Sequence, residues 1–219
     1  NEKSGKGVYN EIEIPRGGEF DLVLADGTQV WLNAESRLRY PVEFSGKERK
    51  VVLEGEAYFQ VKKNPSLPFR VEIRNQVIEV LGTEFNVSGY KDEVHVYTTL
   101  VNGKVKVATT GRDMTLLPGE QCVLDTGDGS MIRQQVDVDK IISWKKGKFI
   151  LEEQTLEQIM QKLARWYDIT VFYQNPALKN KVFKGSVPRY AELQQVLNIL
   201  EKTGEVQFHI QNRTVIVKE

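Results

Sequence analysis

The chain has 219 residues, which is enough for one large domain or two modest ones that fold without metal ions or disulfides. Its 30 Lys and Arg residues balance 30 Asp and Glu residues, so the whole molecule has no net charge to attract nucleic acid or anionic lipid. No apolar run is long enough to span a membrane or to form the core of a signal peptide. We therefore expect either a cytosolic protein or a soluble part of a longer one.

Residues 19–135 show short strands separated by turns. Apolar residues alternate in EFDLVL, AYFQV and FRVEI, as expected for strands with one buried face. Asp26-Gly27 lies between two alternating runs and predicts a β-hairpin, because both residues tolerate the positive φ of a tight turn. Several strands contain too few polar residues for a solvated face. The pattern predicts a mainly β domain, either a two-layered antiparallel sandwich or a β-solenoid-like fold.

The pattern becomes helical in the last third of the chain. TLEQIMQKLARWY has apolar residues at helical spacing and Thr155 as its predicted N-cap, and ELQQVLNILEKTG predicts a second helix that ends at Gly204. Apolar positions of the first helix and of the strand after it recur 37 residues later, as in Leu156 and Leu193. The spacing predicts a small α+β domain of two βαβ units that arose by duplication.

These patterns divide the chain into four segments. We expect a tether remnant at residues 1–13, the β domain at 14–137, a linker at 138–145 and the α+β domain at 146–219. The basic cluster WKKGK at 144–148 borders the linker and is interpreted as a solvated segment rather than a phosphate or nucleic-acid contact.

The residues that could support chemistry are few. Cys122 lies in the strand pattern GEQCVLD and is predicted to be buried and unreactive. His95 and His209 are far apart in sequence and, with one cysteine, do not supply a familiar set of zinc ligands. The DTGDGS run lacks the spacing of a calcium loop and predicts a turn. The sequence therefore predicts no catalytic, cofactor-binding or metal-binding residue.

Two alternatives involve the β domain. Glu54 and Glu56 are spaced to share a strand face, as a glycosidase pair requires, but Gly55 between them favours a turn or bulge with a structural role. Trp31, Tyr40 and Tyr58 suggest a carbohydrate-binding or cell-wall-binding domain. That alternative requires at least two of the three rings to lie exposed and coplanar in a groove.

Six segments together resemble a known family: IPRGGEFDLVLADGTQVWLNAESRLRYPVEF, ERKVVLEGEAYFQV, PFRV, VLGTEFNVSGY, LVNGKVKV and LLPGEQ. In order and spacing they resemble the FecR-type anti-sigma regulators of Gram-negative bacteria, over residues 14–124. The later segments RWYDITVFY and VFKGSV are similar to the C-terminal domain of such regulators. That domain in turn resembles the secretin and TonB short N-terminal domain, which is built from two βαβ units.

The resemblance implies a signalling protein without enzymatic activity. Such regulators bind an extracytoplasmic-function sigma factor through a cytoplasmic segment, cross the inner membrane once and receive a signal from a TonB-dependent outer-membrane transducer in the periplasm. This sequence contains neither the cytoplasmic segment nor the membrane helix, so we expect it to be the periplasmic portion. The resemblance also implies that LADGTQVWLNAESRLRYP is a scaffold motif, in which Asn33 satisfies backbone groups of a turn.

A sheet edge is the predicted contact with the transducer, because an open edge accepts a partner strand through main-chain hydrogen bonds. The last strand is the candidate edge, which makes its residues the predicted partner-binding residues: Thr214, Val215, Ile216 and Val217. The alternative is that these residues form an ordinary strand, paired on both sides.

Overall fold

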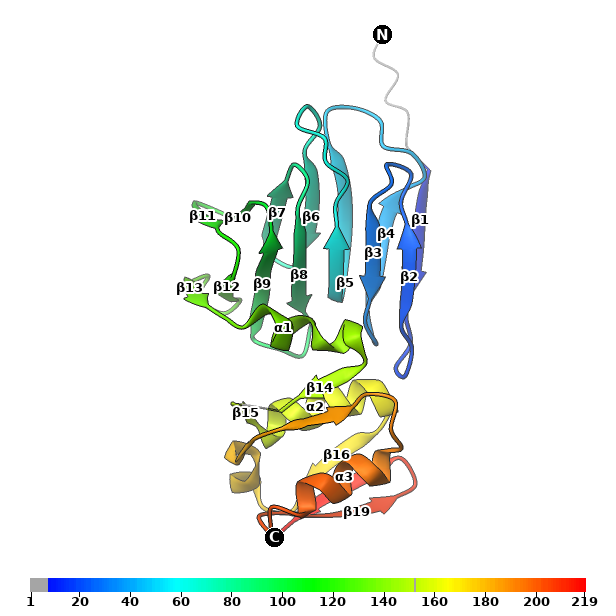
Figure 1. Ribbon diagram of the computed structural model, residues 1–219, viewed down its shortest axis with the longest axis vertical. Helices are drawn as coiled ribbons and strands as arrows, with labels where there is room; N and C mark the ends of the chain where they lie inside the picture. The colour runs from blue at the N-terminus through cyan, green and yellow to red at the C-terminus, as the bar shows by residue number, and fades with distance from the viewer. Residues whose placement is uncertain (1–7, 152) are drawn as a thin grey trace. The chain divides into compact units, whose positions relative to one another are not determined.

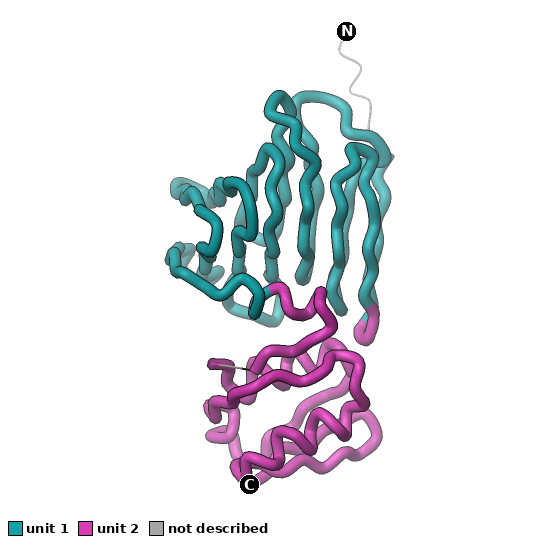
Figure 2. The backbone as a smooth tube through the Cα atoms, in the orientation of Figure 1, with its two compact units in different colours: residues 1–15, 19–141 teal, residues 16–18, 142–219 magenta. Residues whose placement is uncertain are grey.

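The computed structural model describes residues 8–151 and 153–219, and Figure 1 shows its helices and strands. The chain divides into two compact units, which are drawn in different colours in Figure 2 and are described separately below. The first unit consists of residues 1–15 and 19–141, and the second consists of residues 16–18 and 142–219. No helix among the described residues is both long and apolar enough to cross a membrane.

The first unit contains two layers of strands that share one long strand, β5 (Arg49–Gln60). One layer has the order β1, β4, β5, β6, β7, β10, β11, and the bounds of its other strands are Tyr9–Glu13, Arg37–Pro41, Phe69–Ile73, Gln76–Val80, Val105–Thr109 and Arg112–Leu116. The other layer has the order β2, β3, β5, β8, β9, β12, β13, with bounds Phe20–Val23, Gln29–Leu32, Glu84–Gly89, His95–Asn102, Glu120–Asp125 and Met131–Gln135. Neighbouring strands are antiparallel except β5 and β6. The predicted mainly β domain with two layers is confirmed.

Strand β5 crosses from one layer to the other at Gly55. Its first half pairs with β4 and β6, whereas its second half pairs with β3 and β8. Gly55 has φ +89°, and a Cβ atom at this position would overlap Ser36 Oγ. A glycine is therefore required where the strand bends, because only glycine combines this φ with so close an approach.

The second half of the predicted tether, residues 9–13, is a strand of the first unit. Strand β1 pairs with β4, and Ile12 lies opposite the fully buried Leu38. Ile14, the next apolar residue of the alternation, is also buried. The assignment of residues 9–13 to a tether was wrong, because this short alternating run pairs with a strand 28 residues further along the chain. Residues 1–7 lie outside the described residues.

The division between the two units falls between residues 141 and 142, inside the segment predicted as a linker. This segment is helical, with α1 (Val138–Ile141) in the first unit and the 3-10 helix η1 (Ile142–Lys146) in the second. Ile142 and Trp144 are buried. The segment is therefore structured, and the expected linker is a pair of short helices with buried apolar side chains.

The second unit contains two helices and three small sheets. The helices are α2 (Leu156–Tyr167) and α3 (Leu193–Glu201), with a short 3-10 helix η2 (Pro176–Asn180) between them. A three-stranded sheet has the order β16 (Thr170–Tyr173), β20 (Thr214–Lys218), β19 (Gln207–Gln211). The two-stranded sheets are β14 with β18 and β15 with β17, with bounds Lys148–Ile150, Ser186–Pro188, Gln154–Thr155 and Val182–Phe183.

The predicted duplication is visible in the second unit. Helix α2 and strand β16 start 37 residues before α3 and β19. The two strands that flank each helix belong to different sheets, because β14 pairs with β18 whereas β16 and β19 both pair with β20. The equivalent strands β14 and β18 thus pair with each other, whereas the equivalent strands β16 and β19 lie on either side of β20.

The ends of the helices follow from local chemistry. Thr155 is the N-cap of α2 as predicted, and its Oγ1 accepts a hydrogen bond from the Gln158 N–H, while the Gln158 side chain accepts one from the Thr155 N–H. This reciprocal pair is a capping box. Helix α3 ends at Glu201, earlier than predicted, and Gly204 takes its left-handed conformation, φ +75°, in the turn beyond.

Candidate interaction surfaces

The last strand, predicted as an open edge, is the central strand of its sheet. Thr214, Val215, Ile216 and Val217 pair in parallel with β16 on one side and antiparallel with β19 on the other. The prediction of an edge was wrong, because the crossover through both helices places β16 beside the end of the chain. Because the strand is paired on both sides, its main chain has no free side for a partner, and the side chains of Val215 and Val217 are fully buried.

The true edges of this sheet are β16 and β19, and they differ. In β19, the N–H of Phe208 donates to Glu201 Oε1 at 2.6 Å, so a side chain occupies a main-chain donor of that edge. At the start of β16, the N–H of Thr170 donates to the carbonyl of Arg213, just before β20, at 2.8 Å, and just after its end the N–H of Gln174 donates to the carbonyl of Val217 at 2.9 Å. The groups of Val171 and Tyr173 point the other way, because successive peptide groups alternate in direction along a strand.

A row of side chains crosses the outer face of the same sheet. Phe172, Ile216 and His209 are in register on β16, β20 and β19. Phe172 is 57% exposed, His209 is exposed and Ile216 is partly buried. The opposite face holds Val215, Val217 and Phe208 against the helices in the core of the unit. The outer face is therefore weakly apolar at the β16 side and polar at the β19 side.

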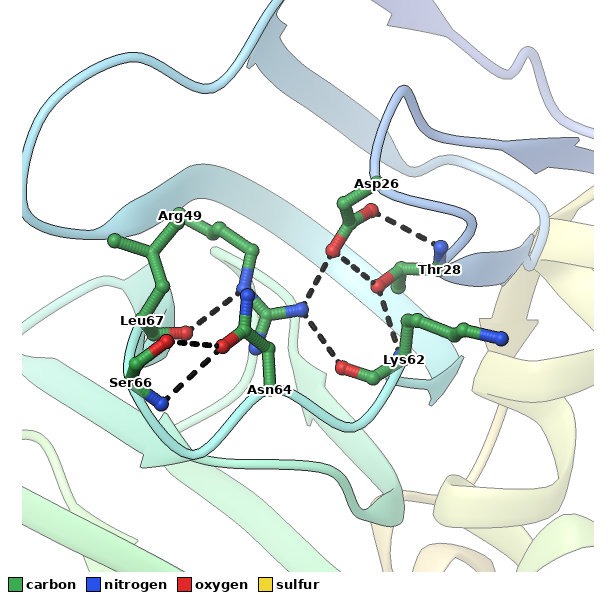
Figure 3. Close-up of polar contacts among 7 residues, drawn as sticks. All are labelled: Asp26, Thr28, Arg49, Lys62, Asn64, Ser66 and Leu67. Atoms are coloured by element: carbon green, nitrogen blue, oxygen red, sulfur yellow. Dashed lines mark hydrogen bonds and ion pairs between the residues drawn. The ribbon is translucent and has the colours of Figure 1, made fainter.

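Burial of Arg49 organises one end of the first unit, as Figure 3 shows. Arg49 Nη1 donates to Asp26 Oδ2 at 2.7 Å and to the carbonyl of Lys62 at 2.8 Å, and Nε donates to the carbonyl of Leu67 at 3.0 Å. Asp26 also accepts from the N–H and the hydroxyl of Thr28. Because the Arg49 side chain is only 1% exposed, this ion pair is held in a low-dielectric environment where its partners are not readily replaced by water.

The segment LADGTQVWLNAESRLRYP is thus a scaffold, as the resemblance implied. Its Asp-Gly turn is joined through Arg49 to the loop after β5, where Asn64 Oδ1 accepts from the N–H and hydroxyl of Ser66 (Figure 3). Further along the motif, Asn33 Oδ1 accepts from the N–H of Ala34 at 2.8 Å. Asn33 therefore satisfies a turn backbone group as predicted.

The pair Glu54 and Glu56 is held in place by separate partners. Glu56 accepts hydrogen bonds from the side-chain amides of Asn33 at 2.7 Å and Asn86 at 3.0 Å. Glu54 forms an ion pair with Lys91 at 2.7 Å. The bend at the glycine between them places the two carboxylates in different layers, which supports their interpretation as structural residues.

The aromatic residues do not form a sugar-binding platform. Tyr58 is 3% exposed, and its ring meets that of Trp31 edge-on, at 70° and 5.6 Å between centroids. Tyr40 is partly buried against the core. The Tyr58 hydroxyl donates to Glu84 Oε2, and burial, followed by this contact, raises the pKa of Tyr58. The expected pair of exposed, coplanar rings is therefore absent from these three residues, and the carbohydrate-binding alternative loses its support.

A second buried arginine lies in the second unit. Arg189 is 1% exposed, and its guanidinium lies 3.8 Å from the ring centroid of Trp166, 5.7 Å from that of Trp144 and 5.4 Å from that of Phe149. In such cation–π contacts, the positive guanidinium is attracted to the negative faces of the aromatic rings. The segment 144–148 was interpreted as solvated, but its tryptophan is buried here. Sequence reasoning missed both Arg49 and Arg189.

The cysteine, the two histidines and the DTGDGS run considered in the sequence analysis lie in strands and in a turn. Cys122 is fully buried on β12, and burial raises the pKa of its thiol to about 11. His95 and His209 lie on β9 and β19, one in each unit. The DTGDGS run forms the turn between β12 and β13, where Asp125 and Asp128 accept backbone hydrogen bonds. The described residues contain no group of three or more His, Cys, Asp or Glu placed to hold a metal ion.

Comparisons with known proteins agree with this two-part architecture. The family model described as FecR protein matches residues 10–106, from β1 to β10, and the one described as FecR, C-terminal matches residues 148–217, from β14 to β20. Two crystal structures, at 1.65 and 2.50 Å resolution, of a "putative anti-sigma factor" from Parabacteroides distasonis ATCC 8503 are similar to the chain. Each has a TM-score of 0.89 and 28% identity, and they cover 96% and 97% of this chain and 99% of their own. No curated protein matches the chain.

Fold and comparisons together define a signalling regulator of the anti-sigma factor class. The two family matches fall one after the other on the two compact units. Within that class, the chain belongs to the FecR family of regulators.

Proposed function

We propose that this chain is the periplasmic portion of a single-pass inner-membrane regulator, which relays a signal from a TonB-dependent outer-membrane transducer to an extracytoplasmic-function sigma factor. The observation that supports it most is the tandem match of the FecR and FecR C-terminal families over two separately folded units. The sigma factor would bind a cytoplasmic segment, and a membrane helix would anchor the protein.

In this proposal the two units have different tasks. The first unit is a rigid scaffold, because its turns and strands are tied together by buried polar contacts such as that of Arg49 with Asp26. The second unit receives the transducer's periplasmic domain. The binding event requires no bond-making chemistry, so the proposal includes no catalytic residue, cofactor or metal ion.

A calorimetric titration tests the proposal. The whole chain is titrated with the purified periplasmic domain of the TonB-dependent transducer encoded beside it, and circular dichroism verifies that both proteins are folded. We expect saturable binding with a dissociation constant of about 10 μM or lower, within the range of specific regulatory contacts. The corresponding domain of an unrelated transducer is the control. Undetectable binding between two folded proteins would contradict the proposal.

A further inference from the structure

Strand β16 has unused main-chain hydrogen-bonding groups along one side. Val171 and Tyr173 alternate with residues that bond to β20, so their N–H and C=O groups point away from the sheet. Within the described part of the chain, no hydrogen bond is formed by these groups. Unpaired groups of this kind are the template on which an additional strand forms.

The sequence of β16 is short but lacks two features that commonly protect such an edge, namely charged residues and proline. Charged side chains, prolines and bulges keep most edge strands from pairing with other proteins. The strand Thr170–Tyr173 has no charged residue and no proline. The other edge of the same sheet, β19, is equally free of Asp, Glu, Lys and Arg, but the Glu201 carboxylate occupies its Phe208 N–H. The two edges of one sheet are therefore not equivalent.

An exposed aromatic side chain lies on the unprotected edge. Phe172 is 57% exposed on the outer face of β16, and its neighbours on that face are Thr170 and the partly buried Ile216. Cross-strand pairs of an aromatic residue with another aromatic or β-branched residue stabilise a sheet. A strand that pairs with β16 would thus gain an apolar contact with Phe172 in addition to main-chain hydrogen bonds.

We propose that β16 is the docking edge for an extended segment of the transducer's periplasmic domain, which adds to the sheet as a fourth strand. This inference rests on the proposed function and specifies its contact. The segment bonds to the main chain of Val171 and Tyr173 and places an uncharged, apolar or aromatic side chain beside Phe172. An apolar side chain is expected at that position because it would contact the aromatic ring of Phe172, which lies beside Ile216.

The test uses two matched variants of the whole chain. Phe172→Asp and His209→Asp each place a carboxylate on an exposed outer-face position, in the same row, on opposite edges of the sheet. Each is titrated with the periplasmic domain of the transducer, and melting temperatures verify that both variants are folded. We expect Phe172→Asp to weaken binding at least tenfold, and His209→Asp to change it less than about twofold. Equal losses, or a greater loss for His209→Asp, would overturn the inference.

An amide-resolved measurement tests the hydrogen bonds themselves. Hydrogen exchange of the wild-type chain is followed by NMR with and without the transducer domain. We expect the amides of Val171 and Tyr173 to exchange at least tenfold more slowly in the complex, and that of Phe208 to be unchanged. Tight binding with protection elsewhere would overturn the inference and leave the proposed function intact, whereas absence of binding would overturn both. Concentration-dependent protection of Val171 in the chain alone would assign the edge to a second copy of the chain and overturn the inference.

Discussion

The edge strands of the two units are protected in different ways. In the first unit, every strand that ends a layer contains charged side chains, namely β1, β2, β11 and β13 with Glu11, Glu13, Asp21, Arg112, Asp113 and Arg133. In the second unit, β16 has none, and β19 relies on a single carboxylate from α3. A charged edge disfavours strand addition because pairing would desolvate the charge. The edges of the first unit thus disfavour strand addition through their charges, whereas β16 does not, and this difference is the basis of the proposed division of tasks.

Each unit contains a buried arginine. Arg49 is bound by a carboxylate and two carbonyl groups, and Arg189 lies near three aromatic rings. The first arrangement depends on a buried ion pair and is therefore sensitive to loss of either member.

The largest expected effect comes from breaking that ion pair. Arg49→Met would leave Asp26 without its cation and the carbonyls of Lys62 and Leu67 without their donor. We expect the free energy of unfolding of the first unit to fall by about 3–5 kcal/mol, the range for a buried pair that loses one partner. Denaturant unfolding followed by hydrogen exchange in each unit measures it, and the second unit should keep its protection.

The matched control for this variant is Arg37→Met. Arg37 pairs with Glu13 at 2.8 Å on the surface, where both side chains are well exposed. Exposed pairs contribute little to stability, so this change should have a much smaller effect. Equal losses in the free energy of unfolding for both variants would show that burial of Arg49 does not strengthen its contribution to stability.

A charged residue introduced on β16 should weaken binding of the transducer domain, as charges on the edges of the first unit are expected to do there. Thr170→Lys gives β16 the kind of residue that protects the edges of the first unit, at a position that is already exposed. We expect about tenfold weaker binding of the transducer domain, equivalent to about 1.4 kcal/mol, with an unchanged melting temperature. Gln207→Lys on β19 is the control, and calorimetry should find its affinity unaltered. Identical affinities for the two variants would argue against β16 as the docking edge.

Removal of the carboxylate that covers β19 should have a moderate effect on stability. Glu201→Ala leaves the Phe208 N–H without its acceptor, and we expect a loss of about 1 kcal/mol, the usual net value of one hydrogen bond. The exchange rate of that amide should rise in the native state. Binding of the transducer domain should be retained, because β16 is untouched. A strong loss of binding would place the contact at β19 instead.

The last expected effect is a pH dependence at Cys122, which is negligible near neutral pH and grows only above pH 9. Burial raises the pKa of this thiol from its ordinary value of 9.0 to about 11, so the native state keeps its proton where the unfolded state has lost it. The stability contributed by the neutral thiol is complete below pH 9 and is lost as the pH rises to about 11. The stability difference between the wild type and Cys122→Ala should therefore shift in favour of the variant over this range. Denaturation curves at pH 8, 9.5 and 11 measure it, and a constant difference would contradict the shift.

Much of the fold followed from local periodicity. Alternation placed Phe69, Val71 and Ile73 on one buried face, and all three are fully buried. The same alternation placed Trp31 out of phase with Val30 and Leu32, and the structure has it on the opposite face of β3. Period and turn chemistry are local properties, and for that reason they were readable from the sequence.

Contacts between segments that are far apart in the sequence could not be predicted from the sequence. Arg49 is in phase with Val51 and Leu53, which was a signal of burial, but only the fold brings Asp26 to it. The last strand was predicted to be an edge, because its sequence does not show which strands lie on either side of it. Its neighbour β16 lies 44 residues earlier, and their parallel pairing depends on the packing of helices between them.

The most direct test of the account compares both units in one complex. Hydrogen exchange is measured along the whole chain while the transducer's periplasmic domain is added to saturation. We predict new protection in residues 170–173 and none in the charged edge strands of the first unit, β1, β2, β11 and β13. New protection in those strands, with β16 unchanged, would contradict the division of tasks between the two units.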